Sequence, residues 1–308
     1  MSGAPSLQTD LCGIALRNPV LAASGTFGYG LEFAKLVDLD ALGGLVVKGL
    51  SREPIEGNPA PRLYETEAGM INSIGLQNIG VRAFVEEKLP GLARLRTAVF
   101  ANVFGYQADD YVEVVRVLED HAGLAGYELN VSCPNTRHGG IYFSSDPALL
   151  AEVVAAVKRV ARRPLMVKLS PNVSAIEPLA RAAEESGADA ISLVNTFVAL
   201  AIDAHTRTPR IGAGFGGLSG PAIKPIALRM VYQAARAVKI PVVGLGGIAT
   251  GEDAAEFLIA GARAVEVGTA TFWDPRSPLR IAHELARFLR RERIADVGEL
   301  VGSLRMGG

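Results

Sequence analysis

The sequence has few cysteines and histidines and almost no net charge. Only two cysteines and four histidines occur in 308 residues, and the formal net charge is −1. Two cysteines exclude a disulfide framework and an iron–sulfur cluster bound by this chain alone. The scattered histidines and the lack of a Cys-x-x-Cys pair argue against a structural metal site. The balanced charge argues against nucleic acid as a partner, because proteins that bind its backbone carry a strong basic excess.

Long apolar runs are also missing. No uninterrupted run approaches the about 18 apolar residues that a membrane-spanning helix needs, and the N-terminus "MSGAPSLQTDLCG" lacks the pattern of a secretory signal. We therefore expect a cytoplasmic protein without membrane contact. Hydrophobic residues make up 49% of the chain and charged residues 20%, which is typical of a globular enzyme and favours a single domain over residues 1–308.

Short, almost continuously apolar runs alternate with helical patterns along the chain. Such runs are typical of parallel strands that are covered on both faces. Helix boundaries are readable between them: Asp146 and Pro147 begin one helix, and Gly187 and Gly261 follow the ends of two others. The expected strands are 19–24, 44–49, 97–102, 126–131, 164–169, 190–195, 241–246 and 264–269.

Eight strands alternating with helices predict a (β/α)8 TIM barrel, with an open doubly wound sheet as the alternative. The longest non-helical insertions, 49–78, 131–146 and 197–220, all follow strands. In a barrel these would gather as long loops at the C-terminal face, where active sites of this fold are built. The opening segment predicts an N-terminal hairpin that closes the opposite end and gives Cys12 a structural role.

Polar residues stand at the C-terminal ends of the apolar strands. Taken singly, an asparagine there caps a turn and a lysine is a solvated surface charge. Their recurrence at six strands instead predicts a ring of hydrogen-bonding groups around one mouth. Asparagines suit a planar imide or amide ligand, and lysines suit an anionic one. The residues are Ser24, Lys48, Asn102, Asn130, Lys168, and Asn195 with Thr196.

The last two strands end in glycine, at 244–247 and 268. The loops after strands seven and eight of a barrel are a usual phosphate site, with backbone N–H groups and a helix N-terminus as the cradle. Here the helix is expected to begin near Gly251, and "GGLSG" (216–220) adds another flexible backbone approach. A phosphorylated cofactor such as FMN fits this pattern. The polar loop "NSIGLQN" (72–78) could wrap a small ligand.

Cys133 lies in "NVSCPN" (130–135), immediately after an expected strand. The residues alone leave two readings open, a small buried hydrophobic side chain and a reactive thiol. A free thiol has a pKa of about 8.5, close enough to neutrality for proton transfer.

Over essentially its whole length, the sequence resembles the class 1 dihydroorotate dehydrogenases, FMN enzymes of pyrimidine (UMP) biosynthesis. The motifs that carry the resemblance occur in the family's order: "ASGTFGYG", "VVKGLS", "NSIGLQN", "NVSCPN", "MVKLSPN", "GGLSGPAIKPIAL", "GLGGI" and "VGTA". The cysteine in "SCPN" separates class 1 from class 2, which carries serine there. "NTRHGGIYFSSDP" (135–147) is more similar to the NAD-linked 1B branch than to the fumarate-linked 1A branch, which stays the alternative.

The resemblance implies the role of each site residue. Cys133 would be the base that removes the C5 proton of dihydroorotate while hydride leaves C6 for FMN. Lys168 would stabilise the reduced flavin. FMN would be bound by Ser24, Lys48, Gly49, Asn102, Asn130, Lys168, Val194, Gly220, Gly246, Gly247, Gly268 and Thr269. The substrate would be bound by Lys48, Asn72, Ser73, Ile74, Gly75, Leu76, Asn130, Asn195 and Thr196.

The resemblance to the 1B branch also implies partners. One FMN would be bound per chain, whereas FAD and a [2Fe–2S] cluster would belong to an electron-transfer subunit that passes electrons to NAD. A homodimer of this chain would form the core of a heterotetramer. Two rival functions are an RNA-modifying FMN barrel, which would need a basic RNA-binding face, and a catalytically silent phosphate-binding barrel.

Overall fold

The predicted barrel is confirmed by the computed structural model, which describes residues 4–132, 134–135 and 141–307. Eight parallel strands close on themselves, so the open doubly wound sheet is excluded. Each strand lies within one of the predicted runs, except that β7 ends one residue beyond the run 97–102. In chain order they are β3 (Val20–Ala22), β4 (Gly44–Val46), β7 (Ala98–Val103), β8 (Gly126–Asn130), β11 (Leu165–Lys168), β12 (Ala190–Leu193), β17 (Val242–Leu245) and β18 (Ala264–Val267).

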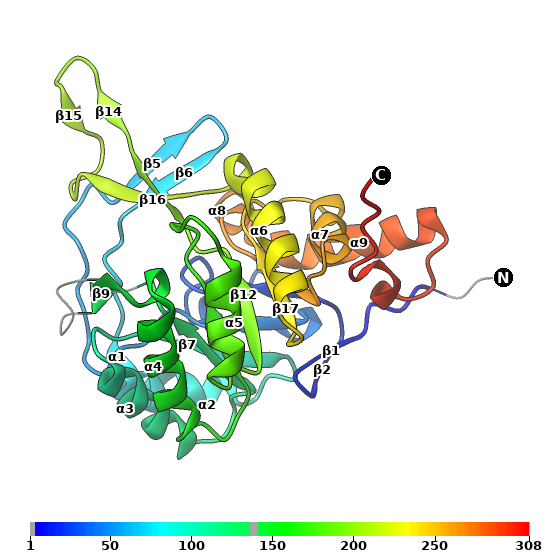
Figure 1. The fold of residues 1–308 in the computed structure, drawn as a ribbon, viewed down its shortest axis with the longest axis horizontal. Coiled ribbons are helices and arrows are strands. Elements are labelled where there is room, and N and C mark those ends of the chain that lie inside the picture. Colours follow the sequence, from blue (N-terminus) through cyan, green and yellow to red (C-terminus); the bar gives the residue numbers. More distant parts are fainter. Residues whose placement is uncertain (1–3, 133, 136–140, 308) are drawn as a thin grey trace.

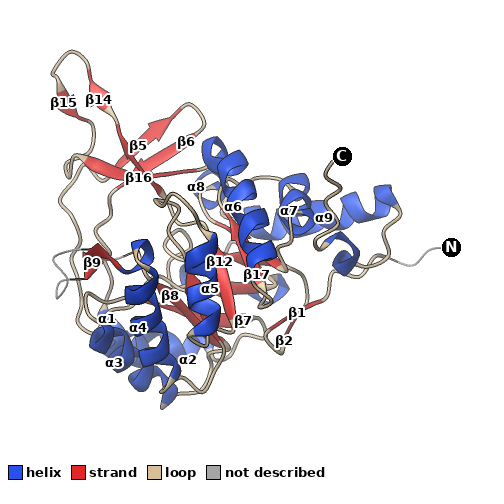
Figure 2. Ribbon diagram, in the orientation of Figure 1, coloured by secondary structure: helices blue, strands red, loops and turns tan. Residues whose placement is uncertain are grey.

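Helices surround the barrel (Figures 1 and 2). Their ends follow the sequence signals: the Asp146 side chain accepts hydrogen bonds from the N–H groups of Ala148 and Leu149, and Gly187 and Gly261 have φ of 97° and 117°. The helices are α1 (Gly80–Ala83), the π-helix η3 (Phe84–Lys88), α2 (Leu89–Leu92), α3 (Ala108–Glu119), α4 (Pro147–Lys158), α5 (Glu177–Glu185), α6 (Lys224–Ala237), α7 (Gly251–Ile259), α8 (Ala270–Trp273) and α9 (Ser277–Glu292). Short 3-10 helices are η1 (Leu31–Phe33), η2 (Leu39–Ala41), η4 (Phe143–Ser145), η5 (Pro221–Ile223) and η6 (Val297–Leu300).

The predicted N-terminal hairpin closes the N-terminal end of the barrel. It consists of β1 (Thr9–Leu11) and β2 (Ile14–Leu16), which pair in antiparallel orientation. Leu11 and Leu16 belong to a buried cluster together with residues from several barrel strands, among them Leu21 and Met166. Cys12 lies at the turn, where its Sγ donates a hydrogen bond to the carbonyl oxygen of Asp189 at 3.1 Å.

The insertions after the strands contain a second sheet that the sequence analysis missed. Figure 1 shows it standing beyond the barrel, with a hairpin projecting from it. "GGLSG" was interpreted as a flexible approach, but residues 216–219 form part of a strand that pairs with residues distant in the sequence. The sheet has the order β13 (Phe197–Leu200), β16 (Phe215–Ser219), β6 (Gly69–Asn72) and β5 (Leu63–Thr66). The smaller pairs are β14 (Ile202–Asp203) with β15 (Thr208–Pro209), and β9 (Pro134–Asn135) with β10 (Ile141–Tyr142).

Within the described ranges, no helix combines the length and the apolar character needed to cross a membrane.

Candidate functional site

A cavity of about 560 Å³ opens where the barrel strands end. All of the residues predicted to bind the cofactor line this cavity: Ser24, Lys48, Gly49, Asn102, Asn130, Lys168, Val194, Gly220, Gly246, Gly247, Gly268 and Thr269. Parallel strands in a closed barrel all point the same way, so their C-terminal residues meet at one mouth. Cys133 lies outside the described residues.

The predicted substrate loop contributes alternate residues to the cavity. Asn72, Ile74 and Leu76 line it, whereas Ser73 and Gly75 face Asn58 instead. The Asn58 Nδ2 donates to Ser73 Oγ at 2.7 Å, and a Cβ on Gly75 would meet the Asn58 backbone nitrogen at 2.5 Å. Gly75 and Leu76 have φ of 74° and 58°, so this part of the loop is turned and does not continue as a strand. The other predicted substrate residues, Asn195 and Thr196 among them, line the cavity.

The glycine turns after β17 and β18 offer unoccupied backbone donors. Among the described residues, no acceptor takes a hydrogen bond from the N–H groups of Gly246, Gly247, Gly268 or Thr269. Gly246 and Gly247 have φ of 121° and 83°, a conformation that glycine adopts without strain. A Cβ on Gly247 would lie 2.8 Å from the Gly220 carbonyl oxygen. These turns therefore form a close-packed cradle suited to a phosphate.

The N-terminus of α7 was expected to complete the phosphate cradle. This expectation is wrong for the N–H groups of Ala249, Thr250 and Gly251, which already donate to carboxylates. Asp253 accepts hydrogen bonds from the N–H groups of Ala249 and Thr250 at 2.9 and 2.8 Å. The N–H group of Gly251 donates to Glu284 at 2.8 Å. The helix is thus capped by Asp253 of its own first turn and by Glu284 of α9, and the anion is left to the donors of the glycine turns.

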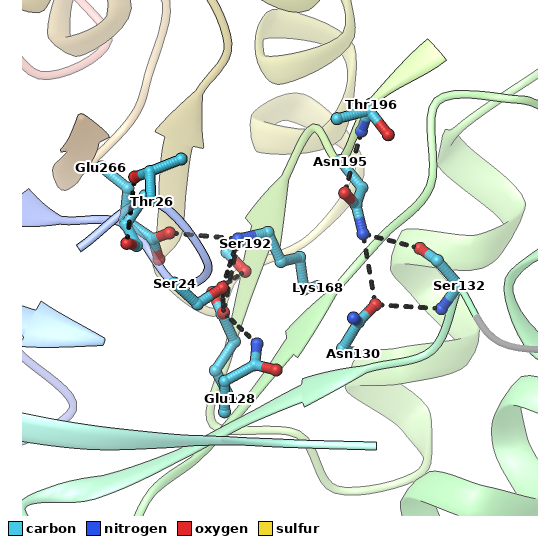
Figure 3. A network of polar contacts seen from close by, with 12 residues as sticks. Ser24, Thr26, Glu128, Asn130, Ser132, Lys168, Ser192, Asn195, Thr196 and Glu266 are labelled. Carbon is cyan, nitrogen blue, oxygen red and sulfur yellow. Dashed lines mark hydrogen bonds and ion pairs between the residues drawn. The ribbon is translucent and has the colours of Figure 1, made fainter. Parts of the chain in front are cut away.

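The ammonium group of Lys168 lies between two buried glutamates in the barrel interior (Figure 3). Its Nζ is 3.4 Å from Glu128 Oε1 and 3.3 Å from Glu266 Oε2. Glu128 also accepts hydrogen bonds from Asn102 Nδ2 at 2.6 Å and Ser192 Oγ at 2.8 Å. Burial opposes the charge of Lys168, but the two carboxyl groups raise its pKa above the ordinary value. Lys168 is therefore a permanently charged group in the cavity floor.

Lys48 is the second lysine of the cavity and, unlike Lys168, it has no carboxyl partner among the described residues. No described side chain forms an ion pair or a hydrogen bond with its Nζ. Burial and the neighbouring charge of Arg62 lower the pKa of Lys48 below the ordinary value for a lysine. A half-buried cation without a counter-ion suits a ligand that brings a negative charge of its own.

Three polar side chains from two strand ends form one network beside Lys168 (Figure 3). Asn195 Nδ2 donates to Asn130 Oδ1 at 3.2 Å and to Ser132 Oγ at 2.9 Å. The Ser132 N–H group donates to Asn130 Oδ1 at 3.3 Å. These bonds connect the segment after β12 to the segment after β8, which continues to Cys133.

Sequence reasoning missed Glu128, Ser192 and Glu266, the residues under the cavity floor. The signal that could have revealed them was a glutamate inside each of two apolar runs, "GYELNV" and "AVEVGT". A charged residue in a strand that is covered on both faces must find a partner inside the barrel. The partner itself, Lys168, comes from a third strand and was not readable from either run.

Comparisons with known proteins agree on one family. The sequence model of that family, described as dihydroorotate dehydrogenase, matches residues 6–289. A relative from Solibacter usitatus, named "Putative dihydroorotate dehydrogenase A (fumarate)", is 82% identical over 98% of this chain and 99% of its own length. A relative from Geobacter sulfurreducens, named "Dihydroorotate dehydrogenase B (NAD(+)), catalytic subunit", is 53% identical over the same shares. A relative of the same name from Maridesulfovibrio salexigens is 52% identical over 97% and 99%.

Proposed function

We propose, from the premise that this chain belongs to the dihydroorotate dehydrogenase family, that it oxidises dihydroorotate to orotate in pyrimidine biosynthesis. The observation that carries the proposal is the cavity at the strand ends. It combines a backbone phosphate cradle, two lysines and several amide side chains in one space. A flavin mononucleotide and a small anionic pyrimidine together need these features.

The described residues fit FMN. Gly246, Gly247, Gly268 and Thr269 would hold the phosphate through their unoccupied N–H groups. Asn102 and Lys168, which also line the cavity, would hold the polar edge of the flavin ring. Bound there, FMN supplies the acceptor for the hydride that leaves C6 of dihydroorotate. The permanent charge of Lys168 favours the negative charge that develops on reduction.

The chain's own residues would bind the substrate and remove its proton. Lys48 would pair with the carboxylate of dihydroorotate, because it is the cation without a counter-ion among the described residues of the cavity. Amide groups of Asn72, Asn130 and Asn195 both donate and accept, as the ring amides of a dihydropyrimidine require. Cys133 would take the proton from C5; the network of Asn195 and Ser132 fixes the segment just before it.

We infer that the electrons leave through a partner subunit carrying FAD and a [2Fe–2S] cluster, with NAD as the final acceptor. The names of the relatives near 50% identity, which include NAD(+) and the words catalytic subunit, support NAD as the acceptor and the presence of a second kind of subunit. So do Phe272 and Trp273, which line the cavity and are 52% and 53% exposed. Exposed aromatic side chains at a cavity rim suit contact with another protein. Fumarate is the second candidate acceptor, favoured by the name of the relative at 82% identity.

We further propose that two copies of this chain form the core of a heterotetramer. The second sheet presents apolar side chains that are largely exposed: Val198 at 64%, Leu200 at 44% and Phe215 at 63%. Burial of such a surface would favour a homodimer. Light scattering with and without co-expressed partner subunit would measure the mass, and a monomer under both conditions would contradict this assembly.

A spectroscopic experiment tests the function directly. The purified chain should show the visible spectrum of a flavin, and the flavin released by acid should be FMN at one per chain. Anaerobic dihydroorotate should bleach it. Absence of flavin after native purification, or a bound flavin that dihydroorotate leaves oxidised, would overturn the proposal.

The acceptor needs a separate measurement. After reduction by dihydroorotate, the isolated chain should reoxidise slowly with NAD and slowly with fumarate, and rapidly with NAD only when the partner subunit is present. Rapid turnover with fumarate would assign the chain to the fumarate-linked branch, and efficient NAD reduction by the isolated chain would contradict the need for a partner.

A further inference from the structure

Three ionisable groups share the barrel interior beneath the cavity, and their charges do not balance if all are ionised. Glu128 and Glu266 are completely buried and Lys168 is 4% exposed. Two carboxylates with one ammonium would leave a net charge of −1 in an apolar core. An uncompensated buried charge is strongly unfavourable, so a proton binds to one carboxylate.

Hydrogen bonding decides which carboxyl group holds the proton. Glu128 accepts from Asn102 and Ser192, and Ser24 Oγ approaches its Oε1 at 3.4 Å. Several donors around one carboxylate stabilise its ionised form. Glu266 contacts Lys168 through Oε2 and shares a hydrogen bond with Glu128, while its Oε1 is buried without a partner among the described residues. A buried oxygen without a hydrogen bond costs much less free energy on a neutral carboxylic acid than on a carboxylate. The proton therefore belongs on Glu266.

No other charge reaches Glu266 from the described elements around it. Its neighbours on the flanking strands are Leu21 of β3 and Leu245 of β17, both apolar. The titratable groups facing it across the barrel are Glu128 and Lys168 (Figure 3). Burial and the charge of Glu128 raise the pKa of Glu266 well above its ordinary value of 4.5, whereas Lys168 and the surrounding donors hold the pKa of Glu128 below it against the effect of burial.

We propose that Glu266 is a positioning residue that keeps a proton beneath the cavity floor, so that the cluster with Glu128 and Lys168 is neutral and Lys168 presents its charge to an anionic group above. Glu128 and Glu266 do not line the cavity, whereas Lys168 does. If Glu266 lost its proton, a second negative charge would stand 3.3 Å from Lys168 and oppose an anion in the cavity. Only the effect on an anion bound in the cavity rests on the proposed function.

Infrared spectroscopy tests the proton itself. The purified protein, with or without bound flavin, should show the C=O stretch of a protonated carboxylic acid at neutral pH. Glu266→Gln should remove that band, whereas Glu185→Gln, an exposed change at the end of α5, should keep it. Glu128→Gln should also remove the band, because Glu266 would then be the sole carboxylate for Lys168 and would ionise. A wild-type spectrum without the band would overturn the proposal.

The pH dependence of the unfolding equilibrium tests whether Glu266 holds a proton in the folded protein, and it needs no flavin chemistry. A carboxyl group whose pKa is raised by folding binds its proton more tightly in the folded state. The stability that this carboxyl group contributes is therefore lost as the pH rises from its pKa in the unfolded chain, near 4.5, to its raised pKa in the folded protein. The unfolding constant of the wild type should rise relative to Glu266→Gln by up to about tenfold per pH unit until Glu266 ionises in the folded state. Parallel pH profiles would contradict a proton held on Glu266.

The reduction potential of the bound flavin tests whether the proton on Glu266 affects the charge that Lys168 presents to the cavity. Above the pH at which Glu266 ionises, the wild-type potential should fall more steeply than that of Glu266→Gln, with Glu185→Gln following the wild type. A retained infrared band with identical potential profiles would refute the link to Lys168 but leave the proton in place. A protein without flavin would defeat the proposed function alone, because the infrared and unfolding results do not depend on it.

Discussion

Asn195 donates a hydrogen bond from its Nδ2 to the Oγ of Ser132 over 2.9 Å. The two residues follow different barrel strands, β12 and β8, and both line the cavity. The same Nδ2 also reaches Asn130, so one amide holds the beginning of the segment that leads to Cys133. A base must be held within hydrogen-bonding distance of the proton that it removes. This contact therefore relates the substrate site to the proposed base.

Cys133→Ser should leave FMN bound but slow flavin reduction by dihydroorotate by roughly 10²–10⁴-fold, the usual contribution of a positioned base. The remaining rate should rise with pH further into the alkaline range, because a hydroxyl group is harder to deprotonate than a thiol. Stopped-flow loss of flavin absorbance across pH measures both effects. A wild-type rate with an unchanged pH profile would show that the thiol serves packing alone.

Cys12→Ser is the matched control, because it makes the same atomic change at the other end of the barrel. Burial and the charges of Asp189 and Asp10 raise the pKa of the Cys12 thiol to about 12, so it is uncharged at neutral pH. This variant should reduce its flavin at the wild-type rate and differ in stability at most.

Ser132→Ala removes the oxygen that accepts from Asn195. We expect FMN content to be unchanged and flavin reduction by dihydroorotate to slow by about fivefold, the equivalent of one net hydrogen bond of about 1 kcal/mol. Ser145→Ala is the control, since the exposed Ser145 donates only to Tyr142 within its own turn. Equal reduction rates in both variants would contradict a positioning role for Ser132.

Gly247→Ala should abolish or strongly reduce FMN binding. The added Cβ would meet the Gly220 carbonyl oxygen and the Lys224 Cβ, each at 2.8 Å, inside the phosphate cradle. Gly214→Ala is matched in backbone strain, because its φ of 81° is close to the 83° of Gly247, but nothing lies within 4 Å of its Cβ. Each change costs about 1 kcal/mol of stability through positive φ. FMN per chain, measured beside thermal unfolding, separates the two effects; equal FMN content would argue against the cradle.

Lys48→Met should weaken the binding of orotate by roughly 10–100-fold, the usual range for a hydrogen bond to a charged group. The pKa of Lys48 is lowered by burial and by Arg62, so its charge is lost at a lower pH than that of an ordinary lysine. Wild-type affinity should therefore fall as pH rises through that lowered pKa, whereas the variant should stay flat there. Titration of the flavin spectrum with orotate measures this, with the exposed Lys35→Met as control.

Local signals in the sequence were sufficient for the barrel and for the mouth of the site. Each strand is a short, mostly apolar run, and helix ends such as Asp146 and Gly187 are specified by capping chemistry within a few residues. Once eight such units close, the direction of parallel strands places every strand-end residue at one mouth. Lys48, Asn102 and Asn195 could therefore be grouped before any contact between them was known.

Contacts between distant segments were decided only by the tertiary structure. Residues 70–72 pair with 217–219, and neither segment specifies the other. The first donors of α7 are taken by Asp253 and by Glu284 of another helix, which no local pattern reveals. Glu128, Lys168 and Glu266 come from three strands, and the charge of each depends on the other two. Burial brings them together, and only that proximity determines which carboxyl group holds a proton.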